Sequence, residues 1–173
     1  MIFMSQSALT VSDRDDEWDR WYVGHLRIMA SVPGIDSAQR FKTSDRGYPA
    51  SLAMYSVASP RVFEDPYYLS VRGMGEWLAL IDRAQYKRNL FEGMGLAPPV
   101  ADDAFLLVAD REQPEPGRAG IEWKWLECVG IDRSTPYRGI AVVPPRVAER
   151  AGRHSGIAVY APVTACPMPQ PSI

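Results

Sequence analysis

The chain has 173 residues, of which 46% are hydrophobic and 23% are charged, and its formal net charge is −2. This composition is typical of a globular protein, and the weak negative charge provides no basic field that would point to nucleic acid or an anionic membrane. No apolar run is long enough to predict a membrane span, and the first residues, MIFMSQSALTV, lack the basic start of a secretory signal. Cys128 and Cys166 form no metal-type pair, so we expect a cytoplasmic protein with reduced thiols.

A strand is predicted at residues 2–11, and an amphipathic helix follows it from about Asp13. Acidic residues crowd the first turn, where the helix dipole favours them, and Ser12 or Asp13 could cap the helix. Pro33 and Gly34 end it, because proline cannot continue a helix and glycine tolerates a left-handed exit. Helical spacing gathers one apolar face: Trp18, Trp21, Tyr22, His25, Leu26 and Met29. A histidine on this aromatic face indicates a site.

The next segments complete a ferredoxin-like order of elements. Residues 35–42 predict a strand with one side formed by Ile35, Ser37, Gln39 and Phe41, and the other by Asp36, Ala38 and Arg40. Residues 50–58 predict a central strand, and residues 60–73 a helical region broken at Asp65 and Pro66. A short helix at 77–83 and a strand at 86–91 follow. The order strand, helix, strand, strand, helix, strand is typical of an α+β fold with an antiparallel sheet and helices on one face.

The rest of the chain contains short echoes of the first half. After a linker at residues 98–99, residues 104–109 predict a buried strand, residues 112–120 a loop, and residues 121–129 a short helix or a strand. The echoes pair residues 34–36 with 130–132, Arg40 with Arg138, and residues 52–55 with 157–160. We therefore expect a ferredoxin-like repeat at 1–95 that carries the site, a degenerate second repeat at 101–165, and a proline-rich tail at 166–173. Two such sheets would cover one another and form an α/β barrel.

The segment Trp21-Tyr22-x-x-His25-Leu26, the turn Val32-Pro33-Gly34 and the strand residue Arg40 together resemble the dimeric α/β-barrel superfamily, and within it the EthD-like proteins. The resemblance covers residues 1–91. It implies two ferredoxin-like units packed face to face. It also implies either cofactor-free isomerases, cyclases, lyases and decarboxylases that act on aromatic or lactone-like molecules, or haem- or quinol-type monooxygenases. His25 and Arg40 match the helix histidine and the strand arginine of such enzymes, whereas the second half has Trp123-Lys124-Trp125-Leu126 without a histidine.

His25 is the leading candidate for general acid/base catalysis, because the pKa of an unperturbed imidazole lies close to neutrality. Tyr22, one helical turn earlier, could hold a substrate oxygen, and Arg40 could neutralise a carboxylate, an enolate or a phenolate. The alternatives are that His25 is a packed core histidine and that Arg40 forms an ion pair with Asp19. The expected walls of a substrate pocket, each of which could instead be ordinary core, are Trp18, Trp21, Tyr55, Tyr68 and Trp77.

The sequence predicts no metal site and no cofactor. The two histidines, His25 and His154, stand far apart, and His154 lies in a turn where an exposed side chain is expected. The leading hypothesis is a cofactor-independent lyase, isomerase or cyclase that acts on a small hydrophobic, aromatic or lactone-type substrate. The alternatives are a haem- or oxygen-dependent monooxygenase of the same fold and a non-catalytic small-molecule-binding or assembly module. The expected partners are the small-molecule substrate and a second copy in a homodimer, with no nucleic acid and no membrane.

Overall fold

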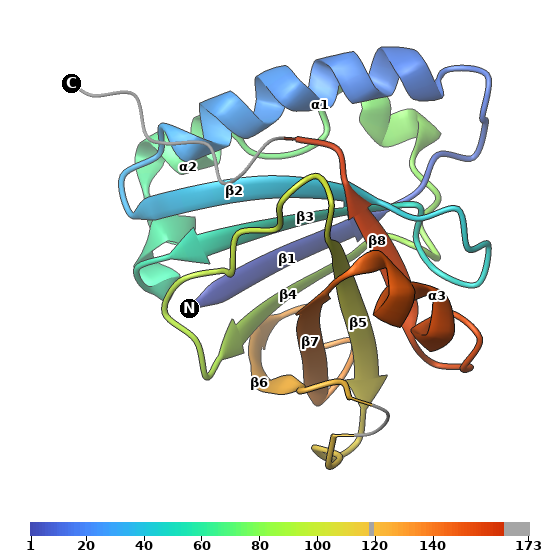
Figure 1. The fold of residues 1–173 in the computed structure, drawn as a ribbon. Coiled ribbons are helices and arrows are strands. Elements are labelled where there is room, and N and C mark those ends of the chain that lie inside the picture. The colour runs from blue at the N-terminus through green and yellow to red at the C-terminus, as the bar shows by residue number, and fades with distance from the viewer. Residues whose placement is uncertain (118–119, 165–173) are drawn as a thin grey trace.

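The computed structural model describes residues 1–117 and 120–164, and eight of its strands close into one antiparallel barrel (Figure 1). The first half contains β1 (Ile2–Ser7), α1 (Asp15–Ala30), β2 (Ile35–Lys42), β3 (Ser51–Val57), the 3-10 turn η1 (Pro60–Glu64), α2 (Pro66–Val71), the 3-10 turn η2 (Gly75–Leu80) and β4 (Lys87–Glu92). The second half contains β5 (Phe105–Arg111), β6 (Lys124–Ile131), β7 (Tyr137–Val143), α3 (Pro145–Ala151) and β8 (Ala158–Pro162). The predicted tail at 166–173 lies outside the described residues.

Both halves have the ferredoxin-like strand order. Around the barrel the strands of the first half lie in the order β4-β1-β3-β2, and those of the second half in the order β8-β5-β7-β6. In each half the spatial order is therefore the fourth, first, third and second strand of that half. The halves join where β4 pairs with β6 and where β2 pairs briefly with β8. The predicted α+β barrel is therefore confirmed. The division at residues 95–101 stays a prediction, as does the homodimer.

Two of the three short sequence echoes do not match equivalent strands, and the third pairs the start of β2 with the end of β6. Residues 52–55 lie in β3, the third strand of its half, whereas residues 157–160 run into β8, the fourth strand of the other half. Arg40 lies in a second strand and Arg138 in a third. The second half also has no helix between β5 and β6 in its described part, and residues 124–131 form a strand. The two halves thus repeat the same topology. The two echoes just described were wrong, because they align residues of non-equivalent strands.

Two strands differ locally from the sequence prediction. β1 ends at Ser7, because the residues after it turn to bond the η2 segment: Thr10 N–H donates to the Leu80 carbonyl, and Asp82 N–H to that of Ala8. In β2 the register shifts between Ile35 and Ser37, which is a β-bulge. The extra residue places Ile35 in the same apolar cluster as Ala38, and not on the side of Phe41.

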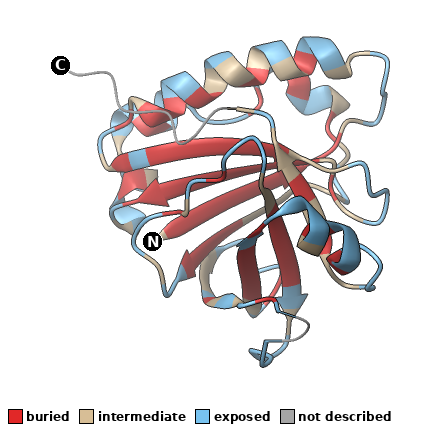
Figure 2. Cartoon of the chain, viewed as in Figure 1, coloured by how far each residue is buried: buried red, intermediate tan, exposed pale blue. Residues whose placement is uncertain are grey.

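Three apolar layers hold the fold together. One fills the barrel interior, one lies between the first sheet and α1, α2 and η2, and one lies between the second sheet and α3. Figure 2 shows most strands largely buried and the helices buried only along the side that faces the sheet. The exception is β6, in which Leu126 alone is buried. Period-two alternation in β1 sends Ile2 and Met4 into the barrel and Phe3 towards α1. No helix among the described residues is long and apolar enough to cross a membrane.

The helix α1 has the face that its sequence predicts. Its buried residues are Trp18, Tyr22, Leu26, Met29 and Ala30. Acidic residues occupy the first turn as expected, but the N-cap position is Arg14 and no side chain caps it, so the cap expected from Ser12 or Asp13 is wrong. The predicted break at Asp65 and Pro66 is confirmed. The Asp65 carboxylate accepts hydrogen bonds from the first backbone N–H groups of α2, at 2.8 and 3.0 Å.

The turn after α1 yields a test of the fold. Gly34 has φ +85°, and a Cβ atom there would lie 2.8 Å from Cγ2 of Val62. Gly34→Ala should therefore lower the free energy of unfolding by at least about 1–2 kcal/mol, the cost of a left-handed L-residue. Gly95→Ala is the matched control, because Gly95 has ordinary φ and a Cβ atom there would meet no atom within 4 Å. Equal urea midpoints for the two variants would contradict the left-handed conformation and close packing of Gly34.

Candidate functional site

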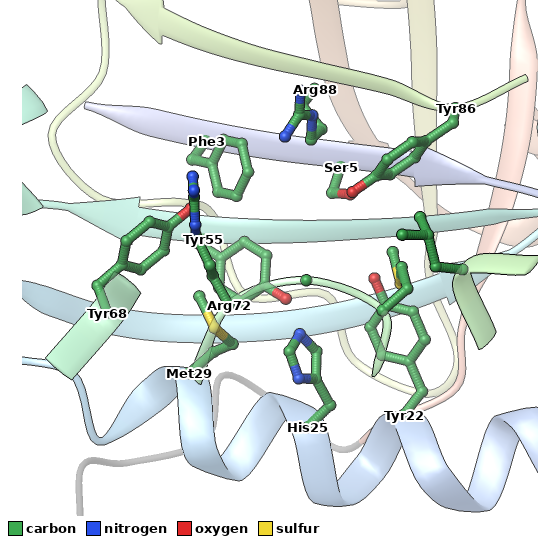
Figure 3. Close-up of a pocket in the computed structure, with 13 residues that line it drawn as sticks. Phe3, Ser5, Tyr22, His25, Met29, Tyr55, Tyr68, Arg72, Tyr86 and Arg88 are labelled. Atoms are coloured by element: carbon green, nitrogen blue, oxygen red, sulfur yellow. The ribbon is translucent and has the colours of Figure 1, made fainter. Parts of the chain in front are cut away.

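A cavity of about 270 Å³ lies between α1, the outer face of the first sheet, and the α2–η2 segment (Figure 3). From α1 it is lined by Tyr22, His25 and Met29. The sheet contributes Phe3 and Ser5 of β1, Tyr55 of β3 and Arg88 of β4, with Tyr86 just before β4. The α2–η2 segment contributes Tyr68, Arg72, Gly73, Met74 and Leu78. The cavity thus lies outside the barrel, in the layer between helices and sheet.

His25 points from α1 into this cavity, as Figure 3 shows. Its ring stacks on Trp21, with centroids 4.9 Å apart and planes 9° from parallel, and meets the edge of Tyr22 at 5.8 Å. Burial lowers the pKa of His25 to about 4. The imidazole is therefore neutral at pH 7, well below the near-neutral pKa that an exposed histidine would have. A neutral imidazole in this position can accept a proton.

Several hydroxyl groups line the cavity. Burial raises the pKa of Tyr22 to about 12, although the Arg40 charge and hydrogen bonding with Ser5 and Tyr55 favour its ionised form. Burial also raises the pKa of Tyr55 well above its usual value. The pKa of Tyr86 is raised for the same reason, and Ser5 hydrogen bonds with it as well. These phenols therefore keep their protons at neutral pH and can donate hydrogen bonds to an oxygen in the cavity.

Two guanidinium groups bring positive charge to the cavity. Arg88 pairs with Asp132 at 3.0 Å and lies over the Tyr86 ring at 5.3 Å. Arg72 follows α2 and lies near Tyr68, whose pKa is raised overall by burial although the Arg72 charge lowers it. No carboxylate within residues 1–117 and 120–164 forms an ion pair with Arg72. The Arg72 charge is therefore available for an anionic group of a ligand.

Arg40 lies behind the cavity and does not line it. Its guanidinium is 1% exposed, lies 2.8 Å from a carboxylate oxygen of Asp19, and donates to the Ser51 hydroxyl at 3.0 Å. It also lies under the rings of Trp18 and Tyr22, at 5.0 and 4.3 Å. The ion pair with Asp19 is the alternative that the sequence left open. In this position Arg40 touches no ligand directly.

The structure brings four of the eight predicted site residues to the cavity, namely Tyr22, His25, Tyr55 and Tyr68. Trp18 and Trp77 are each 1% exposed and belong to the apolar core. Trp21 is partly buried, supports the ring of His25 from behind, and lies 6.3 Å from Trp77. The three tryptophans that were predicted to form the pocket walls therefore pack behind the residues that line the cavity.

Sequence reasoning missed the polar residues that the sheet and the loops contribute. Ser5 shares one face of β1 with Phe3, which strict alternation would have shown once the helix side of the sheet was known. Arg88 reaches the cavity only because β4 pairs with β1. Arg72 follows α2, and no local pattern marks its direction. These contributions depend on contacts between distant segments.

The residues around His25 do not fit a haem. The cavity of about 270 Å³ falls just below the range of about 300–1,000 Å³ for pockets of drug-sized molecules, and a haem macrocycle is larger than such molecules. A histidine that ligates a metal nearly always donates its other ring N–H to a carboxylate or a carbonyl. Among the described residues none accepts such a bond from His25. That part of the chain also contains no cluster of three or more His, Cys, Asp or Glu residues suited to a metal ion.

No protein-family model and no curated protein matches the chain. Solved structures do share its fold. A provisionally named chlorite dismutase superposes with a TM-score of 0.56 at 14% identity, over 94% of this chain and 95% of its own. A provisionally named monooxygenase from Lactobacillus acidophilus superposes with a TM-score of 0.53 at 11% identity, over 99% and 97%. The chain therefore shares the α/β-barrel fold of these structures. At these identities the matches establish the fold alone, and they do not single out the EthD-like proteins.

The environment of His25 predicts an unusually acidic imidazolium. In an NMR titration of the free protein, the His25 ring should change protonation near pH 4 and remain unchanged from pH 8 to pH 6. His25→Gln assigns the signal, because His154 is the only other histidine. Titration of the His25 ring between pH 6 and pH 7 would show that solvent reaches it freely and would contradict its burial.

Proposed function

We propose that the cavity beside His25 is an active site for proton transfer on a small aromatic substrate that carries an anionic group. The observation that carries this proposal is the neutral imidazole of His25, which faces a cavity that also contains phenol hydroxyls and the guanidinium charge of Arg72. A proton acceptor, hydrogen-bond donors and a cation around one small space are the components of enolisation chemistry. The conclusion is a cofactor-independent isomerase, lyase or cyclase.

The cavity selects the substrate by size, ring and charge. Phe3 stacks with Tyr55 at 5.5 Å, and Tyr68 and Met29 complete apolar walls that suit a single aromatic ring or a lactone. Arg72 lines the α2 end of the cavity, where a carboxylate or phenolate would be held. Arg88 lines the sheet side and is paired with Asp132. A volume of about 270 Å³ limits the substrate to a small molecule.

The proton step uses His25 as the base. An imidazole nitrogen takes the proton from an acidic C–H bond next to a carbonyl group, and the electron pair of that bond moves to the carbonyl oxygen as an enolate. Tyr22 can donate a hydrogen bond to that oxygen, and the Tyr55 hydroxyl in turn donates to Tyr22. A pKa near 4 makes His25 a weak base in the empty cavity, but a substrate anion stabilises the imidazolium and raises its pKa in the complex. Return of the proton to another carbon completes an isomerisation.

A monooxygenase is the second candidate, because one of the structures with this fold is named a monooxygenase. The same substrate carbanion could add dioxygen, and the peroxide anion formed would take the proton from His25. Loss of water from that hydroperoxide would leave a carbonyl group, so substrate and dioxygen balance without an external reductant. Consumption of dioxygen in step with turnover separates this reaction from isomerisation or cleavage.

Solvent exchange tests the proton step without knowledge of the product. Aromatic acids, phenols and lactones with an acidic C–H bond are incubated with the protein in D₂O and followed by mass spectrometry. The protein should catalyse incorporation of deuterium into a substrate, and His25→Gln should reduce the rate by at least about 100-fold, the usual contribution of a general base. His154→Gln is the matched control and should exchange at the wild-type rate. Equal rates for His25→Gln and the wild type would exclude His25 as the base.

The charge of Arg72 predicts selectivity for anions. Arg72→Met should weaken binding of benzoate by about tenfold, equivalent to roughly 1.4 kcal/mol, and leave binding of the uncharged benzyl alcohol unchanged. Arg83→Met, which changes an exposed arginine outside the cavity, is the control. Calorimetry or NMR titration measures both ligands. Loss of affinity for both ligands alike would indicate a change of cavity shape, contrary to the role proposed for the Arg72 charge.

A further inference from the structure

A second cavity, of about 400 Å³, lies on the outer face of the second sheet. Trp123 and Trp125 form one side, and Ile121 and Ile157 complete its apolar lining. The polar groups at this cavity belong to Arg111, Glu115, His154 and Ser155. It shares no residue with the cavity beside His25. Its volume falls within the range of about 300–1,000 Å³ that is usual for small-molecule pockets.

The topology explains why an opening exists here. In the first half, α1 connects β1 to β2 and covers the outer face of its sheet. In the second half, the connection from β5 to β6 contains no helix in its described part, and α3 covers only a share of the sheet. Trp123 and Trp125 lie on the portion without a helix. The two halves therefore present different cavities on corresponding faces.

The two tryptophans are held in place before any ligand binds. Their ring centroids are 5.9 Å apart with planes 37° from parallel, and Nε1–H of Trp125 donates to the Glu115 carbonyl at 2.8 Å. Gly139 of β7 lies directly beneath them: a Cβ atom there would be 2.9 Å from the Trp125 ring and 3.0 Å from the Trp123 ring. The absence of a side chain at Gly139 lets both rings pack against the strand. Such preformed aromatic walls reduce the entropic cost of binding a flat molecule.

The charges at this cavity do not favour an anion. The Arg111 charge is paired with the Glu115 carboxylate, to which Nε donates at 2.9 Å, and Nη1 donates to the carbonyls of Asp110 and Gly156 at 2.8 and 3.0 Å. One carboxylate oxygen of Glu115 bonds Arg111, and the carboxylate is 45% exposed, so its other oxygen can accept from a ligand. The faces of tryptophan rings also attract positive charge.

We infer that this cavity is a second ligand-binding site, which takes a planar aromatic molecule that carries an N–H or ammonium donor. The ring lies against Trp123 and Trp125, and its donor group bonds the Glu115 carboxylate. This selectivity is opposite to that of the cavity beside His25, where the charge of Arg72, which forms no ion pair among the described residues, favours an anion.

Three probes with one ring and different charges test the assignment: indole, tryptamine and indole-3-acetate. The indole N–H signals of the ¹⁵N-labelled protein are followed during titration, with Trp123→Phe and Trp125→Phe to assign the two signals. Indole and tryptamine should shift both signals to saturation, and tryptamine should bind about tenfold more tightly than indole-3-acetate, a difference of roughly 1.4 kcal/mol. His25→Gln is the control and should leave these shifts unchanged.

Glu115→Gln makes the test independent of any loss of structure, since Glu115 is largely exposed. It removes the carboxylate and leaves Arg111 without its ionic partner. The variant should therefore lose the preference for tryptamine and bind indole-3-acetate at least as well. The inference is overturned if no probe gives saturable shifts at Trp123 and Trp125, or if indole-3-acetate binds most tightly to the wild type. It is also overturned if Glu115→Gln keeps the original order of affinities.

Discussion

The buried guanidinium of Arg40 fixes how α1 lies on the first sheet. It extends from β2 and reaches the carboxylate of Asp19 on the helix, and the rings of Trp18 and Tyr22 cover it. Burial raises the pKa of Asp19, but the neighbouring Lys42 and Arg40 outweigh that effect and lower it, so the carboxylate stays ionised at neutral pH. A charge that is almost wholly buried is tolerated only with such a partner, because an unpaired one would cost several kcal/mol. One interaction therefore sets the rotation of α1 and, with it, the direction of His25.

Burial determines much of the chemistry that this arrangement allows. His25 has no carboxylate beside it among the described residues, so removal from water leaves a neutral imidazole. The phenols of Tyr22 and Tyr55 keep their protons for the same reason. Positive charge enters from Arg72 and Arg88, which lie at the α2 end and on the sheet side of the cavity. A bound anion supplies the negative partner that the imidazolium form of His25 lacks. Substrate binding is thereby coupled to proton transfer.

Local patterns predicted the features that depend on local physics. The spacing of Trp18, Tyr22 and Leu26 indicated the buried face of α1. Proline and glycine indicated the turn before β2, although the helix itself ends earlier, at Ala30. The ferredoxin-like order followed from short, separable segments. The bulge at Ile35 was not predicted, because a single extra residue shifts a strand without any mark in its composition.

The composition of the site could be predicted only in part. Tyr22 and His25 share a helical face, so spacing alone placed them together. Trp18 and Trp77 have the residue type expected of a pocket wall, but the depth at which each packs depends on the whole sheet and helix layer. Arg88 reaches the cavity through strand pairing, and Arg72 reaches it through the path of the chain after α2. The echoes between the halves were misleading because both sequences satisfy the same strand pattern, whatever their position in the sheet.

The most direct measurement is the pKa of His25 with the cavity filled. Benzoate, or the aromatic acid that binds best, is added to saturation and the imidazole is titrated by NMR. The pKa of His25 should rise from about 4 towards neutrality with the anion and stay near 4 with the uncharged benzyl alcohol. A pKa that does not change when the anion is bound would contradict the role of His25 as the base, because the imidazole would then be uncoupled from the ligand.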